Sequence, residues 1–147
     1  MALGTDPHSY ANFEEAIVTR LDLDLSLDFS KKIISGRVDL TVSDLAGCGF
    51  VCLDAKALEI QEIVDTSSGN MLDFDVAFGS KLGEKVTIKL PSKTCKIRVC
   101  YATTAACNAV QWLDAQQTKG KEHPLVFSQC QAICGRSLFP CQDTPAV

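Results

Sequence analysis

Strict alternation of apolar and polar side chains from Leu21 to Phe29 is the feature that most limits how this chain can fold. Successive side chains of a strand point to opposite faces of a sheet, so a period of two predicts a strand with one apolar and one polar face. In LDLDLSLDF the leucines share one face and the aspartates the other. We therefore expect a half-buried strand in an antiparallel sheet, with its acidic face in water.

The same period returns along most of the chain. Val38–Val42 alternates in this way, and the polar link Ser30–Lys32 predicts a hairpin with the first strand. Further strands are predicted from alternating or short apolar runs at 50–53, 58–64, 72–78, 86–90, 95–101 and 124–127. Turn-forming residues separate these runs, and no amphipathic helix is predicted before residue 104. The fold class is therefore all-β, with layered antiparallel or mixed sheets.

Composition narrows the classes of partner. The chain has 147 residues, which predicts one domain, and its net charge is −4 from 14 basic and 18 acidic side chains. The two signs are interspersed, so no basic surface for nucleic acid is expected. No apolar run of about 18 residues predicts a membrane span. The first ten residues lack the pattern of a secretory signal, so a cytoplasmic location is expected.

Eight cysteines are the least ordinary part of the composition. They occupy positions 48, 52, 95, 100, 107, 130, 134 and 141. Disulfide frameworks belong to shorter, secreted chains, and zinc ribbons need matched pairs of cysteines at a tighter spacing than these. We expect reduced thiols that are mostly buried, and no metal bound by this chain. The alternative is a metal or redox site that uses Cys130, Cys134 and Cys141.

The C-terminal stretch after residue 121 concentrates the functional candidates. A predicted strand at 124–127 delivers Gln129 and Gln131 at its end, and residues 132–138 predict a short helix that Pro140 ends. A primary amide carries both a donor and an acceptor, which is what a site needs to hold a peptide backbone. The alternative is that both glutamines satisfy backbone groups of their own loop.

Several pieces of the sequence together carry a family resemblance. They are Thr5–Ser9, Leu23–Leu25, Asp28–Phe29, Ser35–Gly36, Leu53–Asp54, Gln111–Leu113, Gly120–Pro124, Phe127–Ile133 and Pro140–Pro145. In this order they resemble the N-terminal β domain of the zinc aminopeptidase (gluzincin) family, in its leukotriene A-4 hydrolase branch. The sequence differs from that branch at Cys134–Gly135, where close members have His-Cys.

The resemblance implies both a fold and a site. It implies a saddle-shaped layered sheet that packs against a separate catalytic domain. Residues 1–147 would then be a single β domain, incomplete at its C-terminal end. It also implies that Gln129, Cys130, Gln131 and Ala132 bind substrate at one wall of the peptide cleft. Gln131 and Ala132 would be nearest the substrate's N-terminal residue.

The resemblance also implies that the chemistry is done by residues outside this chain. In the family a Gly-x-Met-Glu-Asn loop binds the substrate amine, and a His-Glu-x-x-His helix with a distal Glu holds one zinc ion. Neither motif occurs in this sequence, so no catalytic residue and no cofactor are expected here. The parent would be a metallo-aminopeptidase, with epoxide hydrolysis as a further activity. The alternative is a stand-alone β-sandwich interaction module, and in either case an open sheet edge favours self-association.

Overall fold

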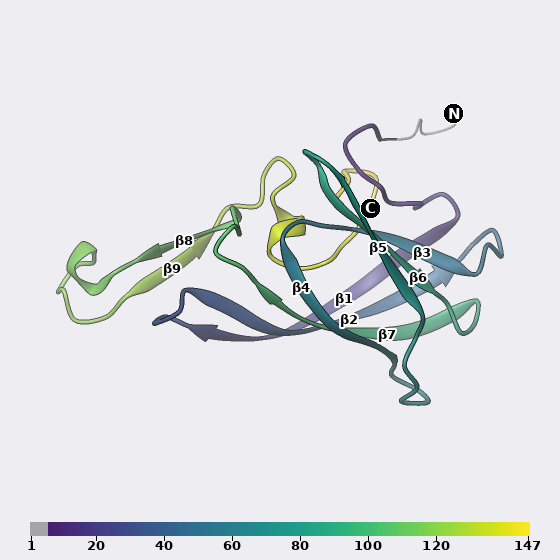
Figure 1. Cartoon of the computed structure of the whole chain (residues 1–147), viewed down its shortest axis with the longest axis horizontal. Coiled ribbons are helices and arrows are strands. Elements are labelled where there is room, and N and C mark those ends of the chain that lie inside the picture. Colours follow the sequence, from purple (N-terminus) through teal and green to yellow (C-terminus); the bar gives the residue numbers. More distant parts are fainter. Residues whose placement is uncertain (1–5) are drawn as a thin grey trace.

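The chain folds as stacked antiparallel sheets (Figure 1). The computed structural model describes residues 6–147. Within that range the nine strands are β1 (Ala16–Asp28), β2 (Ile33–Asp44), β3 (Phe50–Ala55), β4 (Leu58–Asp65), β5 (Phe74–Ser80), β6 (Gly83–Lys89), β7 (Thr94–Thr103), β8 (Val110–Leu113) and β9 (Leu125–Ser128). They pair in the orders β1-β2-β7-β4, β3-β6-β5 and β8-β9. The all-β prediction is confirmed.

The core lies between the two larger sheets. On β2 the side chains of Val38, Leu40 and Val42 are fully buried, because this strand lies inside its sheet and has a second sheet over one face. Alternate residues of β7, β3 and β6 complete the same cluster, and they include Ile97, Val99, Val51, Leu53, Val86 and Ile88. Period-two alternation on β2, β6 and β7 thus predicted the core face correctly, whereas β3 was predicted from a short apolar run.

The opposite face of the first sheet is charged, as the aspartate positions predicted. Arg98 pairs with Asp39 at 2.7 Å, and Arg37 pairs with Asp24 at 2.7 Å across the strands. Lys96 lies 3.4 Å from Asp39 and 3.6 Å from Asp22. Cross-strand charges of opposite sign stabilise neighbouring strands by up to about 1 kcal/mol each, so this face favours the observed strand order.

Strand β1 departs from the sequence-based prediction in two ways. It begins at Ala16, five residues before the alternation starts, because a bulge between Val18 and Arg20 interrupts the period. Its leucines are also more exposed than a half-buried strand implies, at 40% for Leu21 and 41% for Leu23. These leucines share the core face, but β1 is the outermost strand of its sheet and is only partly covered.

The short helix predicted at 132–138 is wrong. The structure has a turn over residues 131–134, followed by one 3-10 turn, η2 (Gly135–Ser137). Gly135 is a poor helix former, and the Ser137 hydroxyl donates to the Cys134 carbonyl oxygen at 2.8 Å. A second 3-10 turn, η1 (Ala115–Gln117), lies between β8 and β9. In the part of the chain that the structure describes, no helix is long and apolar enough to cross a membrane.

The β8–β9 hairpin extends away from the stacked sheets (Figure 1). Trp112 on β8 connects the hairpin to the end of β1, because its indole ring packs edge-to-face on Phe29 with the ring centroids 5.2 Å apart. Leu125 and Phe127 on β9 are exposed, at 50% and 43%. The hairpin leads directly into residues 129–147, which we call the terminal segment.

Candidate functional site

The terminal segment is held in place by one buried arginine. The Arg136 side chain is fully buried, although it carries a permanent charge. Its guanidinium donates to the Asp143 carboxylate at 2.9 Å, the Leu82 carbonyl oxygen at 3.1 Å and the His8 carbonyl oxygen at 2.9 Å. A buried charge is stable only when it is paired and hydrogen-bonded, and these contacts meet that condition. They join the terminal segment to the start of the chain and to the β5–β6 turn.

Asp54, at the end of β3, is the second buried charge of this network. One of its oxygens lies 3.4 Å from the Arg136 guanidinium. The carboxylate also accepts hydrogen bonds from the Ser9 hydroxyl, from the Tyr10 backbone N–H at 2.7 Å and from the Asp143 backbone N–H at 3.1 Å. The N-terminal residues are therefore fixed against the terminal segment by charge-assisted bonds.

Gln142 fastens the other side of the terminal segment to β1. Its side-chain amide donates to the Ala16 carbonyl oxygen at 2.9 Å and accepts from the Val18 N–H at 2.9 Å. One side chain thus occupies backbone groups on the outer edge of β1, as a neighbouring strand would. The rest of that edge, after the bulge, has no strand beside it in residues 6–147.

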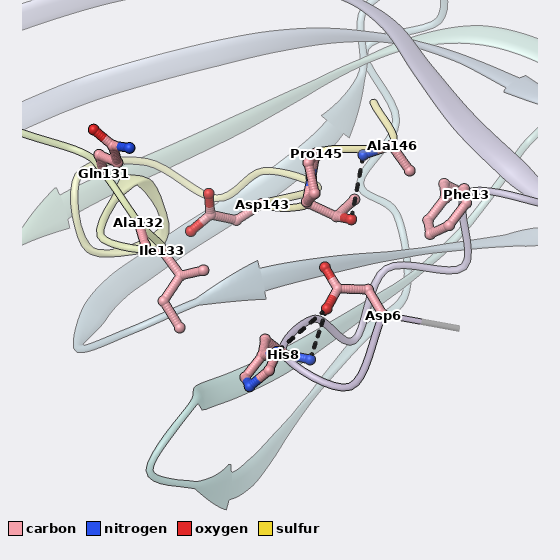
Figure 2. A pocket seen from close by; sticks show the side chains of 10 residues that line it. Asp6, His8, Phe13, Gln131, Ala132, Ile133, Asp143, Pro145 and Ala146 are labelled. Atoms are coloured by element: carbon pink, nitrogen blue, oxygen red, sulfur yellow. Dashed lines mark hydrogen bonds and ion pairs between the residues drawn. The ribbon is translucent and has the colours of Figure 1, made fainter. Parts of the chain in front are cut away.

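These contacts shape an open pocket of about 800 Å³ (Figure 2). Its lining comes from the N-terminal residues, from the turn after β9 and from the end of the terminal segment. The lining residues are Asp6, His8, Phe13, Gln131, Ala132, Ile133, Asp143, Thr144, Pro145 and Ala146. Mostly apolar walls with a few polar groups are typical of small-molecule and peptide sites.

The structure places only two of the four predicted binding residues in this pocket. Gln131 and Ala132 line it, and both are exposed. Gln129 instead extends the hairpin, since its N–H donates to the Ala109 carbonyl oxygen at 2.7 Å. Strand β9 ends at Ser128, so both glutamines follow the strand. Cys130 packs against a small apolar cluster around Ala109 and Leu138, and burial raises the pKa of its thiol.

Asp6 is a pocket residue that sequence reasoning did not assign to the site. Its carboxylate accepts a hydrogen bond from the His8 N–H at 2.9 Å. This bond and one from the Thr144 side chain lower the pKa of Asp6, against the opposing effect of burial. The carboxylate is therefore ionised at neutral pH. The Asp6-Pro7-His8 run is part of the family resemblance, but no pattern in the sequence shows that it lies near Gln131.

The cysteines are unpaired, with no disulfide among the eight. Cys52, Cys95 and Cys141 are buried and the other five are partly buried. Burial raises the pKa of Cys141, so its thiol is a poor nucleophile and a poor metal ligand near neutral pH. Over residues 6–147 no group of three or more His, Cys, Asp or Glu side chains is arranged to hold a metal ion. A zinc site does not fit the residues present here.

Comparison with known proteins decides the family. The model of the peptidase M1 N-terminal domain matches residues 7–147. The chain belongs to this family. Leucine aminopeptidase 2-1 of Meyerozyma guilliermondii is 42% identical over 146 residues, which cover 97% of this chain and 23% of that protein. Leukotriene A-4 hydrolase of Xenopus laevis is 33% identical over 156 residues, which cover 97% of this chain and 24% of that protein.

A solved structure gives the same result for this M1 N-terminal domain. The yeast LTA4 hydrolase in complex with bestatin matches with a TM-score of 0.91 at 36% identity, over 100% of this chain and 24% of that one. The chain thus spans about a quarter of the length of the relatives that it matches. The predicted resemblance to the N-terminal part of the leukotriene A-4 hydrolase branch is confirmed.

Proposed function

We propose that this M1 N-terminal domain forms one wall of the peptide cleft in a leukotriene A-4 hydrolase-like zinc aminopeptidase. The observation that carries the proposal is the pocket of about 800 Å³ in which Gln131 and Ala132 lie beside apolar walls. The exposed Gln131 amide can donate to and accept from a peptide backbone. In this proposal Gln131 and Ala132 contact the substrate, while Gln129 and Cys130 hold the turn that carries them.

The chemistry belongs to residues that this sequence does not contain. A metallo-aminopeptidase of this kind uses its metal ion to polarise the scissile carbonyl and to activate water. Its metal ligands and general base would lie in the further part of such an enzyme, outside residues 1–147. The M1 N-terminal domain then supplies binding and orientation, and by itself it cleaves nothing. Whether the parent also hydrolyses a lipid epoxide is a property of that further part.

Two measurements on the 147-residue chain test this proposal. Backbone amide resonances of Gln131 and Ala132 should shift when a tripeptide is added, while those on the far β4–β7 edge should not. The purified chain should release no amino acid from aminoacyl reporter substrates and should hold no stoichiometric zinc. If the Gln131 resonance does not change at millimolar peptide, this domain does not form a wall of the peptide cleft. If the chain releases an amino acid in a zinc-dependent reaction, the proposal that it supplies only binding and orientation is wrong.

The exposed side chains of β9 favour a second candidate, a stand-alone interaction module. Leu125 and Phe127 present apolar surface on a two-stranded hairpin, which is marginally stable without further packing. The reading frame after Val147 separates the two proposals. A stop codon favours the module, and a continuation with Met-Glu-Asn and His-Glu-x-x-His favours the enzyme.

We also propose a cytoplasmic location, because eight unpaired thiols suit a reducing compartment. Cell fractionation with an antibody to the folded chain tests this, and recovery in a secreted fraction would contradict it. Nucleic acid and membranes are not proposed as partners. The charges on the first sheet pair with one another and form no basic surface.

A further inference from the structure

The pocket beside Gln131 contains a carboxylate whose role the proposed function does not explain. Asp6 lies across the pocket from the 131–133 turn (Figure 2). Its side chain is 18% exposed, so it is mostly withdrawn from water while still reaching the pocket. Two hydrogen-bond donors, the His8 backbone N–H and the Thr144 side chain, fix the carboxylate in that position.

Within residues 6–147, Asp6 forms no ion pair with a lysine or an arginine. Arg136 attracts the Asp6 carboxylate over a longer distance and helps to lower its pKa. Among the ion pairs of residues 6–147, the one that involves Asp6 is with His8, at 3.7 Å, and it exists only when that imidazole is protonated. The His8 side chain is 67% exposed and lies at the pocket rim, so it can move aside for a ligand. Arg136 does not pair closely with Asp6, because its guanidinium is already bonded to the Asp143 carboxylate and to the carbonyl oxygens of Leu82, His8 and Asp143.

The walls around Asp6 are apolar. Phe13 is 8% exposed and lines the pocket together with Ile133, Pro145 and Ala146. Such walls pack against the methylene groups of a long side chain, and they lower the local dielectric constant around the carboxylate. A lysine or arginine side chain has this combination of an apolar stem and a cationic end. A neutral aliphatic side chain, or one that ends in a carboxylate, matches the apolar walls only and does not pair with the Asp6 carboxylate.

We propose that the pocket binds a positively charged peptide side chain, with the Asp6 carboxylate as its ion-pair partner. The proposal rests on the proposed function, because Gln131 and Ala132 hold the same peptide. Asp6 is then a specificity residue: it selects which peptides occupy the wall and takes no part in bond cleavage. Residues 6–13 thereby form one side of the binding site.

A pair of isosteric peptides tests the proposal on the 147-residue chain. The probes are Lys-Ala-Ala and norleucine-Ala-Ala, which differ in the side-chain ammonium and share the same N-terminus. We expect Lys-Ala-Ala to bind about three- to tenfold more tightly, as a partly screened ion pair predicts. In Asp6→Asn this preference should disappear, and the affinity for the norleucine peptide should not change. The preference in the unchanged chain should also shrink as salt is added.

Asp73→Asn is the matched control. Asp73 has a 90% exposed side chain and does not line the pocket, so its substitution removes the same charge elsewhere. It should leave the preference intact. The asparagine oxygen can still accept from His8 N–H, and the amide spectrum of Asp6→Asn shows whether the fold is kept.

The outcomes separate this proposal from the one it rests on. If both peptides shift the Gln131 resonance with equal affinity, the Asp6 proposal is overturned and the peptide wall stands. A lysine preference that survives in Asp6→Asn overturns it in the same way. If neither peptide shifts that resonance, the pocket is not a peptide site and both proposals fail.

Discussion

At the scale of single residues, Arg136 is the buried charge that joins the segments around the pocket. Its guanidinium contacts the carboxylates of Asp54 and Asp143 and three backbone carbonyl oxygens, from segments far apart in the sequence. Replacing a buried charge leaves its partners unpaired in a low-dielectric site, which is the costly part of breaking such a network. Asp54 and Asp143 would be those partners.

We therefore expect Arg136→Met to lower the free energy of unfolding by about 3–5 kcal/mol. Urea denaturation followed by circular dichroism measures this. Arg20→Met is the control, because Arg20 pairs with Asp22 on the surface, with its side chain 72% exposed. The surface substitution should shift the midpoint far less. Similar losses in the two variants would show that the buried network contributes no special stability.

Asp65 gives a prediction for the pH dependence of stability. Hydrogen bonds from the side chains of Ser68 and Ser67 lower its pKa from the ordinary 3.8 to about 2. A carboxyl whose pKa is depressed in the folded state stabilises the fold above the unfolded pKa and loses that contribution as pH falls through the folded one. Asp65→Asn should therefore flatten the loss of stability between pH of about 4 and about 2. Identical pH profiles for the two proteins would contradict the hydrogen bonding of this turn.

At the scale of elements, β1 carries most of the differences between expectation and structure. An alternating pattern gives the face of each side chain, and it was right for the leucines and aspartates of β1. It does not give depth, because exposure depends on whether another strand or sheet lies alongside. Leu21 lies opposite Leu40 in register, yet the first is 40% exposed and the second fully buried.

Gln142 protects the start of β1, and its removal should expose that edge. We expect Gln142→Ala to cost about 1–3 kcal/mol, since it leaves the Ala16 carbonyl and the Val18 N–H unpaired. Hydrogen exchange at the Val18 amide should become faster. Gln111→Ala, an exposed position on β8, should change neither quantity. Unchanged exchange at Val18 would mean that another group occupies this edge.

The uncovered part of β1 predicts self-association of the isolated domain. Unpaired backbone groups beside exposed leucines are a template for a further strand. Leu23→Lys should weaken concentration-dependent association in sedimentation velocity. Leu45→Lys, a 62% exposed leucine outside the strands, should not. A monomer at every concentration would rule out this edge as a contact.

At the scale of the whole molecule, the sequence predicted the sheets better than the site. Strands such as β2 and β7 repeat a simple period, so they are visible locally. The pocket is not, because Asp6 and Gln131 are far apart in the sequence. Arg136, Asp54 and Thr144 bring these two segments together through contacts that no local pattern shows. A lone charge in an otherwise uncharged stretch, as Arg136 is in Ile133–Phe139, is a signal for a buried ion pair, but it does not identify the partner.

The cysteines test the integrity of the fold as a whole. We expect a thiol reagent to titrate all eight after denaturation without reductant, because none is in a disulfide. In the native protein Cys52, Cys95 and Cys141 should react slowest, since burial raises the pKa of each thiol. Fewer than eight thiols in the denatured chain would revive the redox alternative at Cys130 and Cys134.

The bond from Arg136 to the His8 carbonyl oxygen spans 128 residues of sequence. Contacts of such separation form late, because the entropy of closing a long loop must be overcome before they contribute. Gln142 closes a second loop of similar length onto β1, with a separation of 124 residues to Val18. A ribosome must therefore release the chain as far as Arg136 before residues 8–10 can take up their final contacts. During synthesis the β1–β2 hairpin can form early, whereas the pocket is among the last parts to form.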